Sequence, residues 1–168
     1  MELNKIRLRP LQEKDAARML EWLRNEDVTK FLTINGSSMT LNDALCFIKK
    51  AGDESVDLHR AIVDENDNYL GTVSLKNINK DEASAEYAIT LHPSAMGTGA
   101  AGAASEMIAK LAFEELFLSR VYLNVLKINK RAVRLYEKQG YRYTHSSSTD
   151  FGGDELELLW FEIDKRGE

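Results

Sequence analysis

The chain has 168 residues, of which 43% are hydrophobic and 29% charged, and a formal net charge of −5. This length predicts one domain over residues 1–168, large enough to bury most of the surface that the unfolded chain exposes. The acidic balance argues against a nucleic-acid partner, which would favour a basic face, and no apolar run approaches membrane-spanning length. We therefore expect no nucleic acid and no membrane among its partners.

Cys46 is the one cysteine, so an internal disulfide is excluded. A lone thiol suits a reducing compartment, and no secretory leader opens the chain, so we expect a cytoplasmic protein. Cys46 falls on an apolar helical stripe, which predicts a small core residue rather than a reactive one.

Apolar periodicity and turn residues predict the elements of the first half of the chain. Thr40 followed by Asp43 is typical of a helix start. The polar run 64–68 between two apolar runs indicates a hairpin turn. In chain order we expect a strand over 6–9, helices over 15–24 and 41–48, strands over 58–63 and 69–75, a turn over 77–82 and a strand over 85–91.

The same signals in the second half of the chain predict a long helix, a crossover connection and a last hairpin. The helix follows a glycine-rich loop and runs to about Leu118. A strand over 121–125, a helix over 130–138 capped by Gly140, and a hairpin of 141–144 with 156–163 around a polar loop at 146–153 follow. Early hairpins followed by a strand–helix–strand crossover predict an α+β fold, with a mixed, mostly antiparallel sheet and helices on both faces.

The glycine- and alanine-rich segment 92–102 is the most informative stretch of the sequence. Its small residues allow a sharp turn and a close approach of a ligand to the backbone. Because a helix follows directly, the loop supplies N–H groups without intrahelical partners at the positive end of the helix dipole. Such a place binds phosphate without a basic side chain, so we expect a phosphorylated cofactor.

Gly97, Gly99 and Gly102 also spell the G-x-G-x-x-G fingerprint of dinucleotide-binding proteins. That fingerprint requires an acidic residue at the end of the next strand, about 20 positions on. The strand over 120–127 is followed by no Asp or Glu, and the remaining chain is too short for a doubly wound domain. The dinucleotide interpretation is therefore disfavoured.

The same loop resembles the pyrophosphate loop of the GNAT superfamily of N-acetyltransferases. The family pattern Gln/Arg-x-x-Gly-x-Gly/Ala corresponds to 96–101, just after Pro93. A second family block, Asn-x-x-Ala-x-x-x-Tyr-x-x-x-Gly-Phe/Tyr, is matched by Asn129, Ala132, Tyr136, Gly140 and Tyr141. Two motifs in the right order are far more specific than one, and the resemblance extends over essentially the whole chain.

The resemblance implies the GNAT fold, acetyl-CoA as co-substrate and no metal ion. In the family, the strand before the loop splays from the next one, and pantetheine lies in the gap like an added strand. The pyrophosphate is then held by main-chain N–H groups of the loop. The cofactor-binding residues implied in this way are Ile89, Thr90, Leu91, Met96, Gly97, Thr98, Gly99, Ala100, Ala101 and Asn129.

Two residues are candidates for the proton transfers of amine acetylation. Tyr136 matches the family tyrosine near the thioester sulfur, and a phenol is neutral at pH 7 and can protonate the leaving thiolate. Its alternative interpretation is an aromatic core residue. Glu86 shares a strand face with Ala88 and Thr90, where it could deprotonate the amine directly or through water; the alternative is a solvated glutamate.

The loop departs from the family pattern at two positions. Met96 replaces the usual Gln or Arg, and Thr98 replaces the usual basic residue. Charge-assisted contacts to the pyrophosphate are lost with them, which predicts weaker cofactor binding than a basic loop confers. An alternative is that Lys127, Lys130 or Arg131 reaches the phosphates instead.

The acceptor amine is less well defined by the sequence. The stretch from Glu21 to Thr33 resembles members of the family that acetylate amino groups of nucleotide-linked sugars, with Trp22 and Phe31 for stacking and Arg24 for phosphate. Protein N-termini, polyamines and other small amines are alternative acceptors. Outside enzymes, the alternative is a non-catalytic acyl-CoA-binding regulatory module. A homodimer through exposed strand edges is a further expectation.

Overall fold

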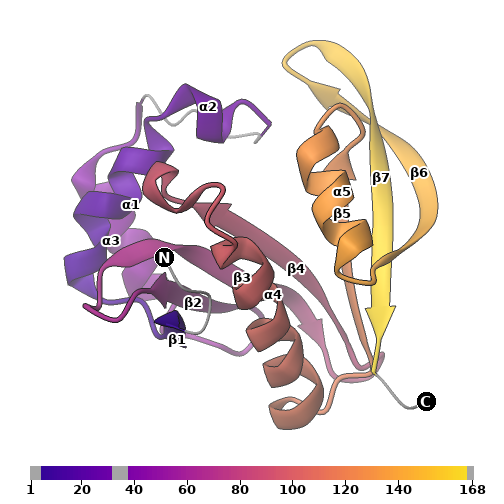
Figure 1. Cartoon of the computed structure of the whole chain (residues 1–168), viewed down its shortest axis with the longest axis horizontal. Coiled ribbons are helices and arrows are strands. Elements are labelled where there is room, and N and C mark those ends of the chain that lie inside the picture. Colours follow the sequence, from indigo (N-terminus) through magenta and orange to yellow (C-terminus); the bar gives the residue numbers. More distant parts are fainter. Residues whose placement is uncertain (1–4, 32–37, 166–168) are drawn as a thin grey trace.

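The computed structural model describes residues 5–31 and 38–165 and builds them around one seven-stranded sheet of order β1-β2-β3-β4-β5-β7-β6 (Figure 1). Among the described residues, neighbouring strands of the sheet run antiparallel, except for β4 and β5, which are parallel. The predicted α+β fold with a mostly antiparallel sheet is confirmed. The strands are β1 (Arg7–Arg9), β2 (Leu58–Val63), β3 (Tyr69–Asn79), β4 (Ser84–Leu91), β5 (Arg120–Leu126), β6 (Arg142–Phe151) and β7 (Asp154–Asp164), and the helices are α1 (Ala16–Leu23), α2 (Glu26–Thr29), α3 (Leu41–Lys50), α4 (Ala100–Lys110) and α5 (Lys130–Lys138).

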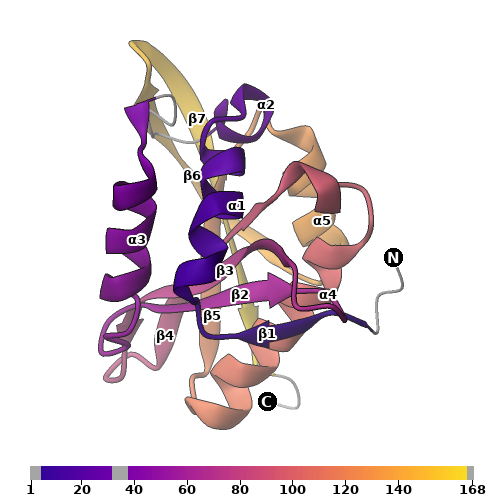
Figure 2. The same ribbon diagram turned by 90° about the vertical axis from the view of Figure 1, so that its left-hand side faces the viewer.

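Helices cover the two faces of the sheet over different strands. Helices α1 and α3 lie side by side against β2 and β3 (Figure 2), where Met19 and Ala44 pack on Val63 and Tyr69. Helices α4 and α5 belong to the larger core, where Ile108 and Tyr136 join Val73, Leu123 and their neighbours. Of the described helices, none is long and apolar enough to cross a membrane.

Strands β4 and β5 part soon after they meet. They pair only over Ser84–Glu86 and Arg120–Tyr122 among the described residues, whereas β4 pairs with β3 out to Leu91. In Figure 1 the two strands diverge above this point, with the N-terminus of α4 on one side and α5 on the other. The wedge-shaped opening expected from the family resemblance is therefore present.

Several predicted elements have the predicted bounds. Strand β2 and helix α5 match them, and α3 begins with a capping box in which Thr40 accepts from the Asp43 N–H at 3.2 Å and Asp43 accepts from the Thr40 N–H at 2.9 Å. Residues 146–153 were predicted as a polar loop. In the structure β6 continues to Phe151, and the turn is formed by Gly152 and Gly153 alone. This strand is exposed along most of its length, so it needs no apolar alternation and shows none.

Three further sequence predictions are wrong in detail. Strand β3 runs to Asn79, inside the predicted turn, and α4 ends at Lys110, where a π-helical turn over Leu111–Glu115 replaces its last predicted turns. Cys46 is exposed on α3 rather than buried, because Ala44 and Ile48 form the buried side of that helix.

Gly71 on β3 lies where the backbones of β3 and β4 approach closely. A Cβ added there would come within 2.3 Å of the Thr90 carbonyl oxygen and 3.0 Å of the Leu91 Cα. Both contacts are with backbone, which cannot move aside as a flexible side chain can. Gly71 therefore allows the close approach of β4, the strand that borders the opening.

We predict that Gly71→Ala lowers the free energy of unfolding by about 2 kcal/mol, the usual cost of overpacking a tight site. Denaturant titration of the purified variant measures this. Gly52→Ala is the matched control, because its new Cβ would meet the Lys49 carbonyl oxygen at 3.4 Å, and we expect a change within about 0.5 kcal/mol. Equal effects of the two substitutions would contradict the explanation.

Candidate functional site

A cavity of about 1030 Å³ occupies the opening between β4 and β5. Its walls come from β4, β5, α5, the loop before α4, helix α2 and the end of the β6–β7 hairpin. Among its lining residues are the predicted positions Glu86, Ile89, Thr90, Leu91, Met96, Gly97, Gly99, Ala101, Asn129 and Tyr136; Thr98 and Ala100 are not among them.

The loop before α4 turns through two left-handed residues. Gly97 and Gly99 have φ values of 75° and 86°, and Gly99 is the residue that precedes α4. Glycine adopts this conformation without the steric cost that a side chain would add. The turn directs the first amides of α4 toward the cavity, where Gly99, Ala101 and Gly102 line the wall.

The N–H groups of this loop fall into two sets. Those of Met96, Thr98 and Ala100 donate within the loop, to Pro93 O, Ala95 O and Thr98 Oγ1. Those of Gly97, Gly99, Ala101 and Gly102 have no acceptor among the described residues. The free donors form a cradle that fits a diphosphate, and Gly102 was not singled out from the sequence although it belongs to the same glycine run.

Thr98 shapes the loop from inside. Its hydroxyl donates to Ala95 O at 2.6 Å and accepts from the Ala100 N–H at 3.3 Å. The side chain that replaces a basic residue of the family pattern thus points into the turn. It provides the rigidity of the loop and leaves the anion contacts to the backbone.

The start of the loop is tied to helix α1. Nε2 of His92 lies 2.5 Å from Oε2 of Glu21, and Nδ1 accepts from the Ser94 N–H at 3.1 Å and lies 2.7 Å from the Ser94 hydroxyl. Arg18 donates to the same hydroxyl at 3.2 Å and to the Tyr69 carbonyl at 2.8 Å. These bonds span α1, β3 and the loop, and they fix where the loop begins.

Tyr136 stands at the cavity wall with its ring in the core. The ring meets Tyr87 and Tyr141 edge-on, with centroids 5.8 and 5.9 Å apart. Burial raises the pKa of Tyr136 to about 12, so its hydroxyl keeps its proton at neutral pH. That hydroxyl has no hydrogen-bond partner among the described residues, and it is therefore free to donate to a group in the cavity. Tyr136 is therefore a buried residue that also lines the cavity, and its role as a proton donor stays a prediction.

Glu86 lies across the opening on β4. Its side chain is 16% exposed, and its carboxylate meets Lys76 Nζ at 3.3 Å and accepts from Asn124 Nδ2 at 3.4 Å. The two contacts use different carboxylate oxygens, Oε2 and Oε1, and Glu86 is one of the residues that line the cavity. Glu86 is therefore neither a fully solvated surface glutamate nor a buried one.

Two predicted cofactor contacts remain: the backbone edge of β4 and the side chain of Asn129, which caps α5. His92 N–H donates to Leu70 O, and by the alternation of an antiparallel ladder the even-numbered residues of β4, Thr90 included, bond to β3. Ile89 and Leu91 then direct their backbone groups toward the opening. Asn129 caps α5 by accepting from the Ala132 N–H at 3.3 Å, which leaves its side-chain N–H₂ available to the cavity.

Of the basic residues that were expected as alternatives near the phosphates, only Arg131 lines the cavity. Lys127 pairs with Glu157 at 3.0 Å, and Lys130 does not line the cavity. Arg131 does line it, as do Arg134 and Lys138, which were missed from the sequence. Their spacing of three and four positions on α5 was the signal that could have identified them, since it places them on one helix face.

The expected sugar-nucleotide contacts are not brought together. Trp22 is buried and its Nε1 donates to the Tyr69 hydroxyl at 2.9 Å, so it is a core residue. Arg24 donates to Met39 O and does not line the cavity. Phe31 does line it, beside Asp27, while Leu32 and Thr33 lie outside the described residues.

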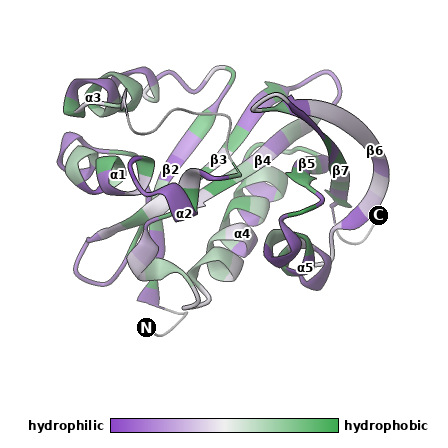
Figure 3. Cartoon of the chain, turned by 90° about the horizontal axis from the view of Figure 1, so that it is seen from above, coloured by the Kyte–Doolittle hydropathy of each residue, from purple (hydrophilic) through white to green (hydrophobic). Residues whose placement is uncertain are grey.

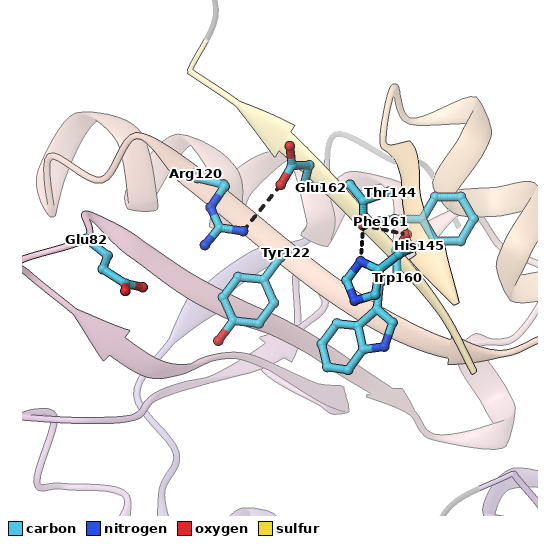
Figure 4. Close-up of a pocket in the computed structure, with 8 residues that line it drawn as sticks. All are labelled: Glu82, Arg120, Tyr122, Thr144, His145, Trp160, Phe161 and Glu162. Carbon is cyan, nitrogen blue, oxygen red and sulfur yellow. Dashed lines mark hydrogen bonds and ion pairs between the residues drawn. The ribbon is translucent and has the colours of Figure 1, made fainter. Parts of the chain in front are cut away.

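A second, smaller hollow of about 200 Å³ lies on the uncovered sheet face of β5, β7 and β6 (Figure 4). His145 stacks on Trp160 with centroids 5.5 Å apart, and Arg120 covers the Tyr122 ring while it pairs with Glu162. The ring face that would receive a cation is thus occupied by the protein itself. Within 5–31 and 38–165, no group of three or more His, Cys, Asp or Glu side chains is arranged to hold a metal ion.

Comparisons with known proteins agree on this architecture. The family model described as acetyltransferase (GNAT) domain matches residues 5–142. Spermidine N(1)-acetyltransferase of Escherichia coli K12 is 27% identical over 136 residues, which are 81% of this chain and 72% of that protein. The crystal structure of spermidine N-acetyltransferase from Vibrio cholerae in complex with CoA and spermine superposes with a TM-score of 0.87 at 23% identity, covering 96% of each chain. A GNAT-family acetyltransferase from Bacillus anthracis gives a TM-score of 0.83 at 20% identity, covering 95% of each.

We predict that Thr98→Val weakens binding of CoA by about fivefold, because a lost hydrogen bond of about 1 kcal/mol loosens the loop and leaves the Ala100 N–H unpaired. Calorimetric titration with CoA measures this. Thr98→Ser keeps the hydroxyl and is expected to bind like the wild type. The explanation fails if the valine and serine variants bind CoA equally well.

Proposed function

Because the chain belongs to the acetyltransferase (GNAT) domain family, we propose that it transfers the acetyl group of acetyl-CoA to a primary amine of an aliphatic polyamine. One observation carries the transfer chemistry: the unpartnered hydroxyl of Tyr136 and the free N–H groups of the loop line the same cavity. A phosphate cradle and a proton donor in one cleft are the two parts that acyl transfer from a CoA thioester requires.

Each residue that lines the cavity would have a role that follows from its position. The free amides of Gly97, Gly99, Ala101 and Gly102 would hold the diphosphate, and the edge of β4 at Ile89 and Leu91 would pair with the pantetheine amides. Acetyl-CoA supplies the acetyl group as an activated thioester. Glu86 would accept the proton that the amine loses, directly or through water, and Tyr136 would donate a proton to the sulfur that leaves.

The acceptor end of the cavity suits a flexible cationic amine. Asp27 brings a carboxylate without a side-chain partner among the described residues, and Phe151 brings aromatic surface. The Phe31 ring already has Lys30 Nζ 5.2 Å from its centroid. Carboxylates and ring faces both attract ammonium groups. The spermidine acetyltransferases among the relatives support the same acceptor class.

A sugar-nucleotide acceptor is less favoured by this geometry. Trp22 and Arg24, which were expected to stack on the base and hold the phosphate, make other contacts and do not line the cavity. A silent acyl-CoA-binding module is also less favoured, because a protein that only binds has no need of Tyr136 and Glu86 facing one cleft.

We predict that Tyr136→Phe lowers kcat by about 100-fold, the lower range for removal of a general acid. Since the pKa of Tyr136 is raised to about 12, the wild-type enzyme should show no loss of kcat near pH 10 from ionisation of this phenol. Thiol release from acetyl-CoA measures both quantities. Calorimetry with CoA serves as the control, and unchanged affinity with lost turnover separates catalysis from binding.

The acceptor is tested with a panel of amines at saturating acetyl-CoA. We expect kcat/KM for spermidine and spermine to exceed that for an amino-sugar nucleotide and for a peptide N-terminus by about 100-fold, because only the polyamines add a second ammonium for Asp27. Glu86→Gln in the same assay should lower kcat for every accepted amine. Binding of CoA without turnover across the panel would instead identify the regulatory module, and preference for the nucleotide would restore the first expectation.

A further inference from the structure

Lys76 places an amine of the protein itself in the main cavity, beside the candidate base. Its Nζ lies 3.3 Å from Oε2 of Glu86, and its side chain is 40% exposed. The two residues stand opposite each other on β3 and β4. Both line the cavity that Tyr136 also lines. An amine, a carboxylate and a phenol thus share one cleft.

Lys76 and Tyr136 reach this cavity from opposite sides of the sheet. Leu75 and Tyr87, which follow or precede the paired residues in sequence, belong to the core that contains Tyr136. Because side chains alternate along a strand, Lys76 and Glu86 point to the other side. Figure 3, seen from above, shows β3, β4 and β5 next to one another, with α4 and α5 on one side of them. A thioester held in the opening would have the amine on one side and the phenol on the other.

The Lys76–Glu86 pair lies where the opening begins. Pairing of β4 with β5 ends at Glu86 and Tyr122 among the described residues. Asn124, two positions farther along β5, donates to Oε1 of Glu86 at 3.4 Å, while Oε2 is the oxygen that meets Lys76. The amide and the ammonium therefore hold the carboxylate in place, with the amine directly at its side.

The other lysines of the cavity lack such a carboxylate. Lys30 and Lys138 line the same cavity, but neither forms an ion pair in the part of the chain that the structure describes. Lys127 has the opposite combination, because it pairs with Glu157 at 3.0 Å and does not line the cavity. Within 5–31 and 38–165, only Lys76 combines a place in the cavity with a glutamate beside its amine.

We propose that Lys76 is a self-acetylation site, whose amine takes the acetyl group of acetyl-CoA bound in the same cavity when no polyamine is present. A lysine side chain is protonated at neutral pH and must lose a proton before it attacks. A base acts within hydrogen-bond reach of that proton, and such contacts are often long before the substrate binds. The contact between Lys76 and Glu86 meets this condition. The proposal rests on the proposed function, because it takes acetyl-CoA to be the ligand of this cavity.

The bonds and protons of the step balance. Glu86 takes a proton from the Lys76 ammonium, and the neutral amine attacks the thioester carbonyl carbon, so that a C–N bond forms and the C–S bond breaks. Tyr136 protonates the leaving thiolate. The nitrogen loses a second proton as the amide forms, which restores the phenol through solvent, while Glu86 releases its own proton to solvent. The acetylated side chain is neutral, so Glu86 loses its paired cation.

Mass spectrometry of the whole protein incubated with acetyl-CoA, without any amine, tests the proposal. We expect a single added acetyl group that peptide mapping assigns to Lys76 and that is missing in Lys76→Arg. The rate at Lys76 should exceed that at Lys127 by about 100-fold, the lower range for acid–base assistance. Lys127 is the matched control, because its amine also has a glutamate partner but lies outside the cavity.

Two variants and one competitor separate an enzymatic step from chemical modification by acetyl-CoA. Glu86→Gln and Tyr136→Phe should each slow acetylation of Lys76 by about 100-fold and leave that of Lys127 unchanged. Saturating spermidine should protect Lys76, because both amines need Glu86. The half-time should not depend on protein concentration, since donor and amine share one cavity. Thermal melts confirm that each variant is folded.

The possible outcomes separate this proposal from the proposed function. Acetylation of Lys76 that is no faster than that of Lys127, or that spermidine leaves undiminished, overturns the self-acetylation site. A protein that releases thiol from acetyl-CoA with spermidine but never modifies Lys76 overturns it as well, and leaves the proposed function intact. A protein that acetylates neither spermidine nor Lys76 refutes both.

Discussion

The separation of β4 from β5 is the constraint on which the site depends. The two strands join over three residue pairs and then diverge, while β4 stays bonded to β3 as far as Leu91. One strand therefore has a backbone edge inside the molecule without a strand partner. Edges of this kind favour an added strand-like ligand. The glycine loop and α5 flank the same opening, so the free amides of the loop, the edge of β4 and the Tyr136 side chain line one cavity.

The sequence allowed much of this architecture to be predicted because its signals are local. Thr40 with Asp43, the apolar run of β2, and the glycines at 97 and 99 each depend on nearby residues. The outer part of the exposed strand β6, residues 146–151, could not be predicted, because its partner β7 supplies the hydrogen bonds and no apolar alternation is needed. Cys46 shows the limit of a helical stripe, since the tertiary packing that selects the buried face is not encoded in periodicity alone.

The predictions for the site also differ according to whether they depend on nearby or on distant residues. Tyr136 and Asn129 were identified by their resemblance to a family motif, and both line the cavity. The contacts of Trp22 and Arg24 were not, because they depend on Tyr69 and Met39, which are distant in sequence. Arg134 and Lys138 stand between these cases. Their spacing on one helix face is visible in the sequence, but only the structure shows that this face lines the cavity.

The bonds around His92 join elements that serve different ends of the cleft. Glu21 and Arg18 belong to α1, which leads directly into the acceptor-side helix α2, whereas Ser94 opens the phosphate loop. Side-chain hydrogen bonds thus tie the first helix of the fold to the turn that precedes α4. The two walls of the cleft are therefore parts of one packed body, although they lie about seventy residues apart in the sequence.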